Sequence, residues 1–254
     1  MDYQIERLRQ GAVFTITRSA HLNALNREVW RGLESCLDEL EGSGGRFLLI
    51  TGEGDRAFSS GSDLKDGVLE HWDQQAAKSD KIRNLLLRLS QSTIYSIAVV
   101  NGMAYGGGLE LALACSQRMS ASTSRFSMPE IRLGLIPSYG GTQFLPAVVG
   151  RARASELMLT GRVLNAEEAL EWGIVSYVHN TRTALMDHAR SIANSVASFS
   201  DRASAAVMRC LTVSGGVPTQ EGMNIESSEL ANLISDSRAK EGIRAFLARE
   251  KPSS

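Results

Sequence analysis

The stretch that decides the fold reads VVNGMAYGGGLELALA and spans residues 99–114. An apolar run from Ser96 to Val100 predicts a buried strand, and the nearly all-apolar stretch after the glycines predicts a buried helix. The first amides of a helix have no internal partner, and glycines there let a ligand come close, so the turn suits an oxygen that carries negative charge. Glu110 lies in the first turn, where a carboxylate either stabilises the helix dipole or takes part in chemistry.

The same glycines fit nucleotide-binding motifs poorly. A dinucleotide fingerprint that starts at Gly106 and Gly108 has Leu111 in place of its third glycine. The chain also contains no G-x-x-x-x-G-K-[ST] sequence. The stretch therefore favours a tight strand-to-helix turn or a site for a developing oxyanion over a phosphate cradle.

Composition narrows the function classes. The 254 residues carry a net charge of −1, so we expect neither a nucleic-acid partner nor another polyanion. No apolar run approaches the roughly 20 residues of a membrane span, and the first residues do not resemble a secretory signal, so we expect a cytoplasmic protein without a membrane partner. The cysteines are far apart, which favours free thiols: Cys36, Cys115 and Cys210. The histidines do not cluster in the sequence and match no metal-binding spacing, so no metal site is indicated: His21, His71, His179 and His188.

The periodicity along the chain predicts an α/β body followed by a helical tail. Strands are expected at 3–8, 13–17, 47–51, 96–100, 117–121, 125–128 and 174–178. One helix is expected from an N-cap at Asn26 to Gly42, and a second over 64–89. A third is expected after Gly106, and short helices are expected up to residue 160. A capping box at Asn165 and Glu168 is expected to start one more. Residues 52–62 are expected to form a loop. Beyond Thr183 only helices are expected, including an amphipathic piece at 236–249.

Three stretches in one order resemble the crotonase (enoyl-CoA hydratase/isomerase) superfamily, closest to its two-glutamate hydratases. They are AFSSGSDLK at 57–65, NGMAYGGGLELA at 101–112, and FSMPEI at 126–131 with GLIPSYGGTQ at 134–143. The resemblance covers nearly the whole chain. Some positions depart from the usual pattern of the family, namely Ser19 after Arg18, Phe144 where many hydratases have Arg, and Ser62 where Ala is frequent.

The resemblance implies a spiral of β-β-α units over residues 1–195 and a helical region at 196–254 that assembles a homotrimer or a dimer of trimers. It also implies an acyl-CoA thioester substrate and no separate cofactor, because coenzyme A is part of the substrate. Matched by motif, the amides of Ser62 and Gly107 form the oxyanion hole. The residues expected to bind substrate are Ser62, Asp63, Leu64, Lys65 and Gly107.

The acids decide which reaction the resemblance implies. The chain has both glutamates of the family's hydratases, Glu110 and Glu130, and two carboxyls near one water suit hydration of a 2-enoyl-CoA or the reverse dehydration. Matched by motif, Glu130 is the main acid/base and Glu110 orients the water. The alternatives are an enoyl-CoA isomerase or acyl-CoA hydrolase of the same superfamily, a nucleic-acid-binding relative, and a Glu130 that only caps the turn after Pro129.

Overall fold

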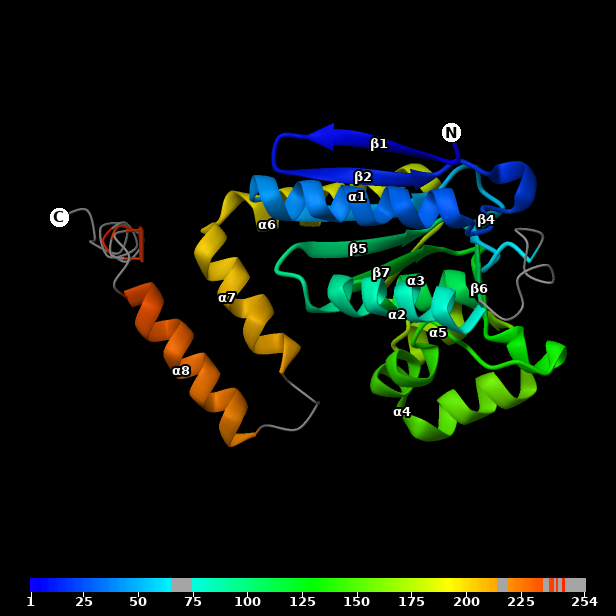
Figure 1. Cartoon of the computed structure of the whole chain (residues 1–254). Helices are drawn as coiled ribbons and strands as arrows, with labels where there is room; N and C mark the ends of the chain where they lie inside the picture. Colours follow the sequence, from blue (N-terminus) through cyan, green and yellow to red (C-terminus); the bar gives the residue numbers. More distant parts are fainter. Residues whose placement is uncertain (65–74, 214–218, 235–237, 240, 242–243, 245–254) are drawn as a thin grey trace.

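The computed structural model describes residues 1–64, 75–213, 219–234, 238–239, 241 and 244. Within these residues the strands form two sheets (Figure 1). The six-stranded sheet has the order β1 (Tyr3–Leu8), β2 (Gly11–Ile16), β3 (Phe47–Gly52), β5 (Tyr95–Val100), β7 (Gln117–Ala121) and β10 (Tyr177–His179). The four-stranded sheet has the order β4 (Ala57–Ser59), β6 (Met103–Tyr105), β8 (Arg125–Ser127) and β9 (Leu164–Asn165).

A β-β-α unit repeats along the chain. The helical parts of successive units are α2 (Gln75–Gln91) after β3 and β4, α3 (Gly107–Ala114) after β5 and β6, and η3 (Pro129–Leu133) with α4 (Gly141–Thr160) after β7 and β8. In each unit the first strand joins the larger sheet and the second joins the smaller one, and successive units pair in parallel. The expected α/β spiral is therefore confirmed. Because each unit repeats the same step, the loop after β4, the start of α3 and the start of η3 follow three neighbouring strands.

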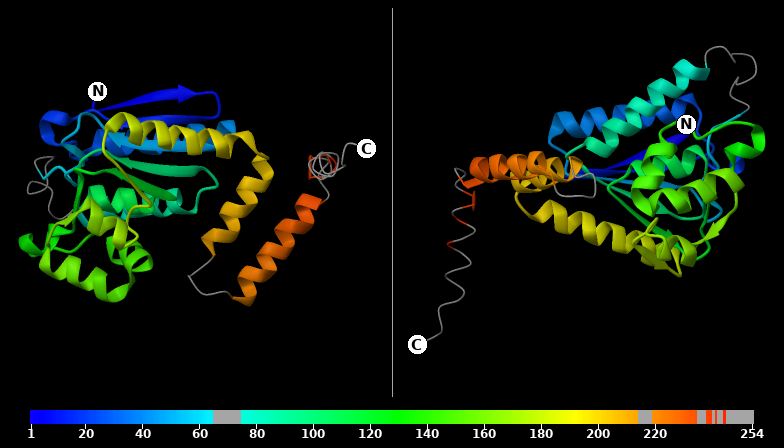
Figure 2. Two further views of the ribbon diagram at one scale, coloured as in Figure 1. Left: turned by 180° about the vertical axis from the view of Figure 1, so that it is seen from behind. Right: turned by 90° about the horizontal axis from the view of Figure 1, so that it is seen from below.

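Helices cover both faces of the larger sheet, with α6 (Arg182–Ser198) on the side opposite to α1 (Arg27–Ser43) and α2 (Figure 2). On the α6 face, Phe47 and Leu49 of β3 belong to one apolar cluster with residues of that helix. On the other face, Leu48 and Ile50 belong to the main core with residues of α1 and α3. A strand covered on both faces has no side for polar residues, which explains why β3 is a continuous apolar run.

Side-chain caps start two helices where the sequence predicts them. The Asn26 side chain accepts a hydrogen bond from the Val29 amide (3.0 Å) at the first turn of α1. Asn165 and Glu168 form the reciprocal bonds of a capping box at the start of α5 (Ala166–Glu171). Each such cap contributes about 1 kcal/mol to helix stability, so these boundaries are set locally.

Other boundaries differ from the prediction. Region 52–62 contains β4 and the glycine-rich turn contains β6, because three-residue strands are too short to show an alternating pattern. The last strand is β10 rather than 174–178, since Ile174 and Val175 are buried in the main core outside the sheets. Helix α1 ends at the left-handed Gly44 (φ 73°) instead of at Gly42. The helix expected at 64–89 is described from Gln75 onward, and most of 236–249 lies outside the described residues.

Helices α7 (Asp201–Thr212) and α8 (Gln220–Ile234) lie beside the body rather than over a sheet (Figure 1). They pack on each other, and they carry exposed apolar side chains at Val207, Leu211, Met223, Leu230 and Ile234. The predicted division between 195 and 196 falls inside α6, and the two-part organisation stays a prediction. In the described ranges, no helix has the length and apolarity that crossing a bilayer requires.

Candidate active site

The spiral brings two carboxyl groups from different units together. Glu110 is in the first turn of α3, and Glu130 is in η3, the turn that follows β8. The Gly106 amide donates to the Ser127 carbonyl (3.0 Å), which joins the starts of these two elements. A Cβ built on Gly106 would lie 2.8 Å from Oε1 of Glu130, so this carboxyl lies directly against the start of α3. Both predicted glutamates are therefore located at the N-terminus of one helix.

The Glu110 carboxyl is buried and held by backbone amides. Its Oε1 accepts hydrogen bonds from the amides of Tyr139 (2.8 Å) and Gly141 (2.7 Å), and the residue is 1% exposed. Burial raises the pKa of Glu110 to about 7, the two amide donors oppose this shift, and the nearby Glu130 adds to it. A carboxyl with this pKa populates both protonation states near neutral pH, which suits acid/base chemistry.

The Glu130 carboxyl is less constrained by the protein. Burial raises its pKa as well. Its Oε2 atom is buried and has no hydrogen-bond partner within the described part of the chain. A buried oxygen without a partner costs roughly 1–3 kcal/mol, so such an atom at the end of a sheet indicates a function. A carboxyl oxygen that no protein donor occupies can exchange a proton with a bound molecule.

Two backbone amides lie beside these acids. Residues on both sides of Ser62 are anchored, because the Leu25 amide donates to the Gly61 carbonyl (2.8 Å) and the Leu25 carbonyl accepts from Asp63 (3.1 Å). Gly107 is the first residue of α3, and a Cβ built on Gly61 would lie 3.3 Å from its nitrogen. In residues 1–64 and 75–213, neither the Ser62 nor the Gly107 amide donates to a backbone carbonyl. The predicted oxyanion pair thus lies close together at the positive end of a helix.

Tyr139 is a site residue that the sequence interpretation missed, although it lies inside the quoted PSYGG motif. Its hydroxyl is 2.6 Å from the Ser62 Oγ atom, and its ring meets the Trp30 ring edge-on with centroids 5.6 Å apart. A Cβ built on Gly107 would lie 2.8 Å from the ring atom Cε2, so only glycine allows this close approach. An aromatic residue between two motif glycines and a proline was the available signal, but nothing in the sequence shows that its ring covers α3.

The other predicted substrate-binding residues are placed as follows. The Asp63 carboxylate forms an ion pair with Nη2 of Arg18 (2.8 Å), so its charge anchors the loop that carries Ser62. Leu64 is 53% exposed. Lys65 lies outside the described residues. The substrate-binding role of these three residues stays a prediction.

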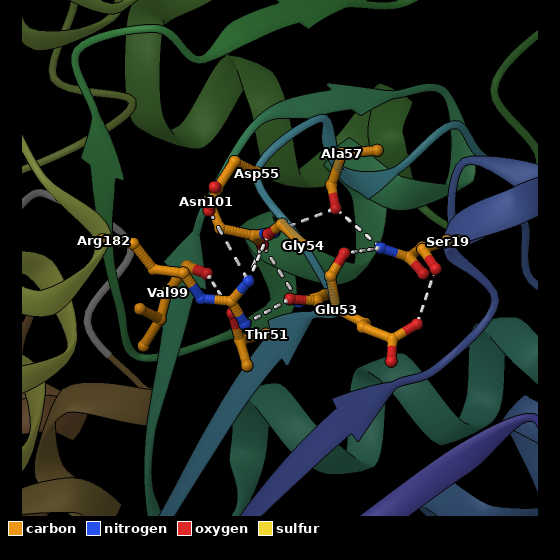
Figure 3. A network of polar contacts seen from close by, with 11 residues as sticks. Ser19, Thr51, Glu53, Gly54, Asp55, Ala57, Val99, Asn101 and Arg182 are labelled. Carbon is orange, nitrogen blue, oxygen red and sulfur yellow. Dashed lines mark hydrogen bonds and ion pairs between the residues drawn. The ribbon is translucent and has the colours of Figure 1, made fainter.

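A buried polar network holds the turn that leads into β4 (Figure 3). Oδ1 of Asn101 accepts from the Gly52 amide (3.0 Å), and its Nδ2 donates to the carbonyls of Gly54 (2.6 Å) and Ala57 (3.0 Å). The Arg182 guanidinium of α6 donates to the Gly52 carbonyl (3.0 Å) and to the Gly54 carbonyl. The network therefore connects the end of β5 and the start of α6 to the turn before β4, the strand that leads to Ser62.

Two of the histidines lie away from this site. His179 and His188, nine residues apart in the sequence, are in contact, with Nε2 of the first 2.9 Å from Nδ1 of the second. They belong to β10 and α6, and α6 packs on the face of the larger sheet opposite to α1 and α2 (Figure 2). Among the described residues, no group of three or more His, Cys, Asp or Glu side chains is arranged to hold a metal ion.

Comparisons with known proteins identify the family of this chain. The family model described as enoyl-CoA hydratase/isomerase matches residues 9–253. A probable enoyl-CoA hydratase of Bacillus subtilis is 36% identical over 244 residues, which cover 95% of this chain and 93% of that protein. The crotonyl-CoA hydratase of Syntrophomonas wolfei is 30% identical over 253 residues, which cover 97% of this chain and 95% of that protein. The crystal structure of an enoyl-CoA hydratase from Bacillus anthracis has a TM-score of 0.92 at 30% identity and covers 99% of this chain and 98% of that one. A match of this extent, in sequence and in fold, shows that the chain belongs to the enoyl-CoA hydratase/isomerase family of the crotonase superfamily.

Proposed function

We propose that this chain adds water to a 2-enoyl-CoA to form a 3-hydroxyacyl-CoA, or catalyses the reverse dehydration. The observation that carries the proposal is a pair of carboxyls, the buried Glu110 and the half-buried Glu130, beside two amides at the start of α3. The names of the relatives from Bacillus subtilis and Syntrophomonas wolfei support it.

In the proposed mechanism the Ser62 and Gly107 amides donate to the thioester oxygen and stabilise the negative charge that develops there. Glu110 orients the water and helps to remove its proton while the water oxygen bonds to C3. The electron pair of the double bond moves toward C2 and the thioester oxygen. Glu130, the main acid/base, then gives a proton to C2. These steps are proton transfers within an oxyanion hole, and the only coenzyme that they involve is the one in the substrate.

Glu110→Gln tests the proposal directly. The amide keeps the shape of the carboxyl but cannot take a proton from water, so hydration of a 2-enoyl-CoA is expected to fall by about 2 kcal/mol or more, a factor of about 30. Isomerisation of a 3-enoyl-CoA needs one proton carrier and no oriented water, and is expected to be retained. Both reactions are followed by the absorbance of the conjugated thioester. Undiminished hydration would show that Glu110 does not act on the water.

The same assays distinguish the alternatives. An enzyme that moves the double bond of a 3-enoyl-CoA but adds no water is an isomerase. One that releases free coenzyme A, detected with a thiol reagent, is a hydrolase. Either result in the wild type, with no hydration of the 2-enoyl-CoA, would contradict the proposal.

We further propose a homotrimer or dimer of trimers located in the cytoplasm, without a nucleic-acid partner. The exposed apolar side chains on α7 and α8 support association with other copies, and the net charge of −1 argues against a polyanion. Light scattering at micromolar concentration measures the mass of the assembly, and a monomer would contradict the proposal.

A further inference from the structure

We propose that the hydrogen bond between Ser62 and Tyr139 fixes the oxyanion loop relative to the catalytic acid, and that Tyr139 is therefore a positioning residue for the reaction. This inference rests on the proposed function, since it assigns a role at the same site. The side chain of Ser62 is distinct from its amide, so the contact of the hydroxyl with Tyr139 leaves the amide available to donate to the substrate.

Tyr139 contacts both halves of the catalytic machinery. Its hydroxyl lies 2.6 Å from the Oγ atom of Ser62, in the loop after β4. Its amide donates to Oε1 of Glu110 on α3 (2.8 Å). One residue thus connects the loop that contributes an oxyanion donor to the acid that is proposed to orient water. A shift of Tyr139 would change the distance between these two groups, to which the rate is sensitive.

The Tyr139 ring is itself held tightly. It is 5% exposed, and its ring contacts both Gly107, where an added Cβ would lie 2.8 Å away, and the edge-on ring of Trp30. The loop that carries it is also anchored, because the Arg83 guanidinium of α2 donates to the Ser138 carbonyl (3.4 Å). A buried aromatic ring that is held by such packing loses little further freedom when its hydroxyl forms a bond, so the contact with Ser62 is preorganised.

The link does not depend on a particular donor. Each hydroxyl carries its own proton, and either one can donate across the 2.6 Å contact. Burial raises the pKa of Tyr139 above its ordinary value, so the phenol stays protonated at neutral pH. The contact therefore persists over the whole pH range in which Glu110 and Glu130 exchange protons.

The experiment compares Tyr139→Phe, Ser62→Ala and the double variant with the wild type. Both single variants remove one hydroxyl and leave the backbone amides in place. Tyr95→Phe is the matched control, because it removes a hydroxyl bonded to Gln117 (3.0 Å) on the strands of the larger sheet. The readouts are kcat and KM for crotonyl-CoA hydration, the melting temperature, and the red shift of a bound cinnamoyl-CoA, whose absorption reports polarisation of the thioester carbonyl.

Each single variant is expected to lower kcat about tenfold, less than the 10²–10³-fold that follows outright loss of an oxyanion donor, because the donors remain but lose their alignment. We expect KM to stay within about twofold and the cinnamoyl-CoA shift to shrink, since the contact acts on the reacting geometry rather than on general binding. The double variant is expected to be no slower than the slower single variant, because both changes remove the same bond. The Tyr95→Phe control is expected to keep both the rate and the spectral shift.

A double variant whose kcat is about a hundredfold below wild type, the product of the two single effects, would overturn the proposal. The two hydroxyls would then act separately. Wild-type turnover in either single variant, or a rise in KM alone, would also overturn it. If the wild type shifts the cinnamoyl-CoA absorption but hydrates nothing, the proposed function fails, and the spectral shift of the variants alone decides on the link. A wild type that shows neither hydration nor a shift overturns both.

Discussion

Replacing Glu110 with glutamine is expected to stabilise the fold while it removes hydration. Glutamine keeps the oxygen that accepts from the Tyr139 and Gly141 amides (2.8 and 2.7 Å), but it takes a titratable charge out of a site that is 1% exposed. Burial raises the pKa of Glu110 from 4.5 to about 7. At about 1.4 kcal/mol per pKa unit, ionisation of this buried carboxyl destabilises the fold by about 3 kcal/mol.

The dependence on pH follows from the two pKa values of Glu110. The folded carboxyl keeps its proton up to pH about 7, whereas the unfolded chain releases it near pH 4.5. In this window the unfolded state binds fewer protons than the folded state, so the free energy of unfolding of the wild type decreases as the pH rises. Glutamine does not titrate. The free energy of unfolding of Glu110→Gln is therefore expected to exceed that of the wild type by less than about 1 kcal/mol at pH 5 and by about 3 kcal/mol at pH 8.

Thermal unfolding at pH 5, 6, 7 and 8 measures this difference. For a chain of this size, about 3 kcal/mol corresponds to a rise in Tm of roughly 6–12 °C at pH 8. Glu39→Gln is the matched control on α1, because this exposed carboxylate pairs with Arg7 (2.6 Å), which lowers its pKa and keeps it ionised over the whole range. The difference in Tm between Glu39→Gln and the wild type should not change with pH. A difference for Glu110→Gln that is constant with pH, or negative at pH 8, would refute the reasoning that burial of the charge dominates.

The remaining predictions concern other parts of the site. Glu130→Gln is expected to lower turnover by about 10²-fold to 10⁴-fold while calorimetry shows that substrate still binds, and activity within a few-fold of wild type would exclude this carboxyl as the acid/base. Gly107→Ala places a Cβ 2.8 Å from the Tyr139 ring. The added Cβ is expected to displace the ring and lower turnover at least about tenfold, while the circular dichroism spectrum stays unchanged. Full activity would show that the position of the ring is unimportant. Asn101→Ala removes the acceptor of the buried Gly52 amide and one of the two donors to each of the Gly54 and Ala57 carbonyls, so urea unfolding should show a loss of about 2–4 kcal/mol. A loss below about 1 kcal/mol would indicate that water replaces the side chain.

Local sequence patterns were sufficient for several elements. The apolar run before the glycines, the cap at Asn26 and the capping box at Asn165 each act within one turn of the chain, so their structures follow from neighbouring residues. The short strands β4 and β6 were missed because three residues have no detectable period. The apolar pair at 174–175 was assigned to a strand because burial in a core and burial in a sheet select the same residue types.

The site shows the same division. Sequence patterns were enough to predict the helix start at Gly107, the carboxyl in its first turn and, through the resemblance, Glu130 as the second acid. The three-dimensional structure was needed to show that the Gly61 backbone lies against the Gly107 nitrogen and that Tyr139 bonds to a serine 77 residues away. The physical reason is that these contacts depend on the parallel stacking of successive β-β-α units, a long-range arrangement that no local pattern encodes.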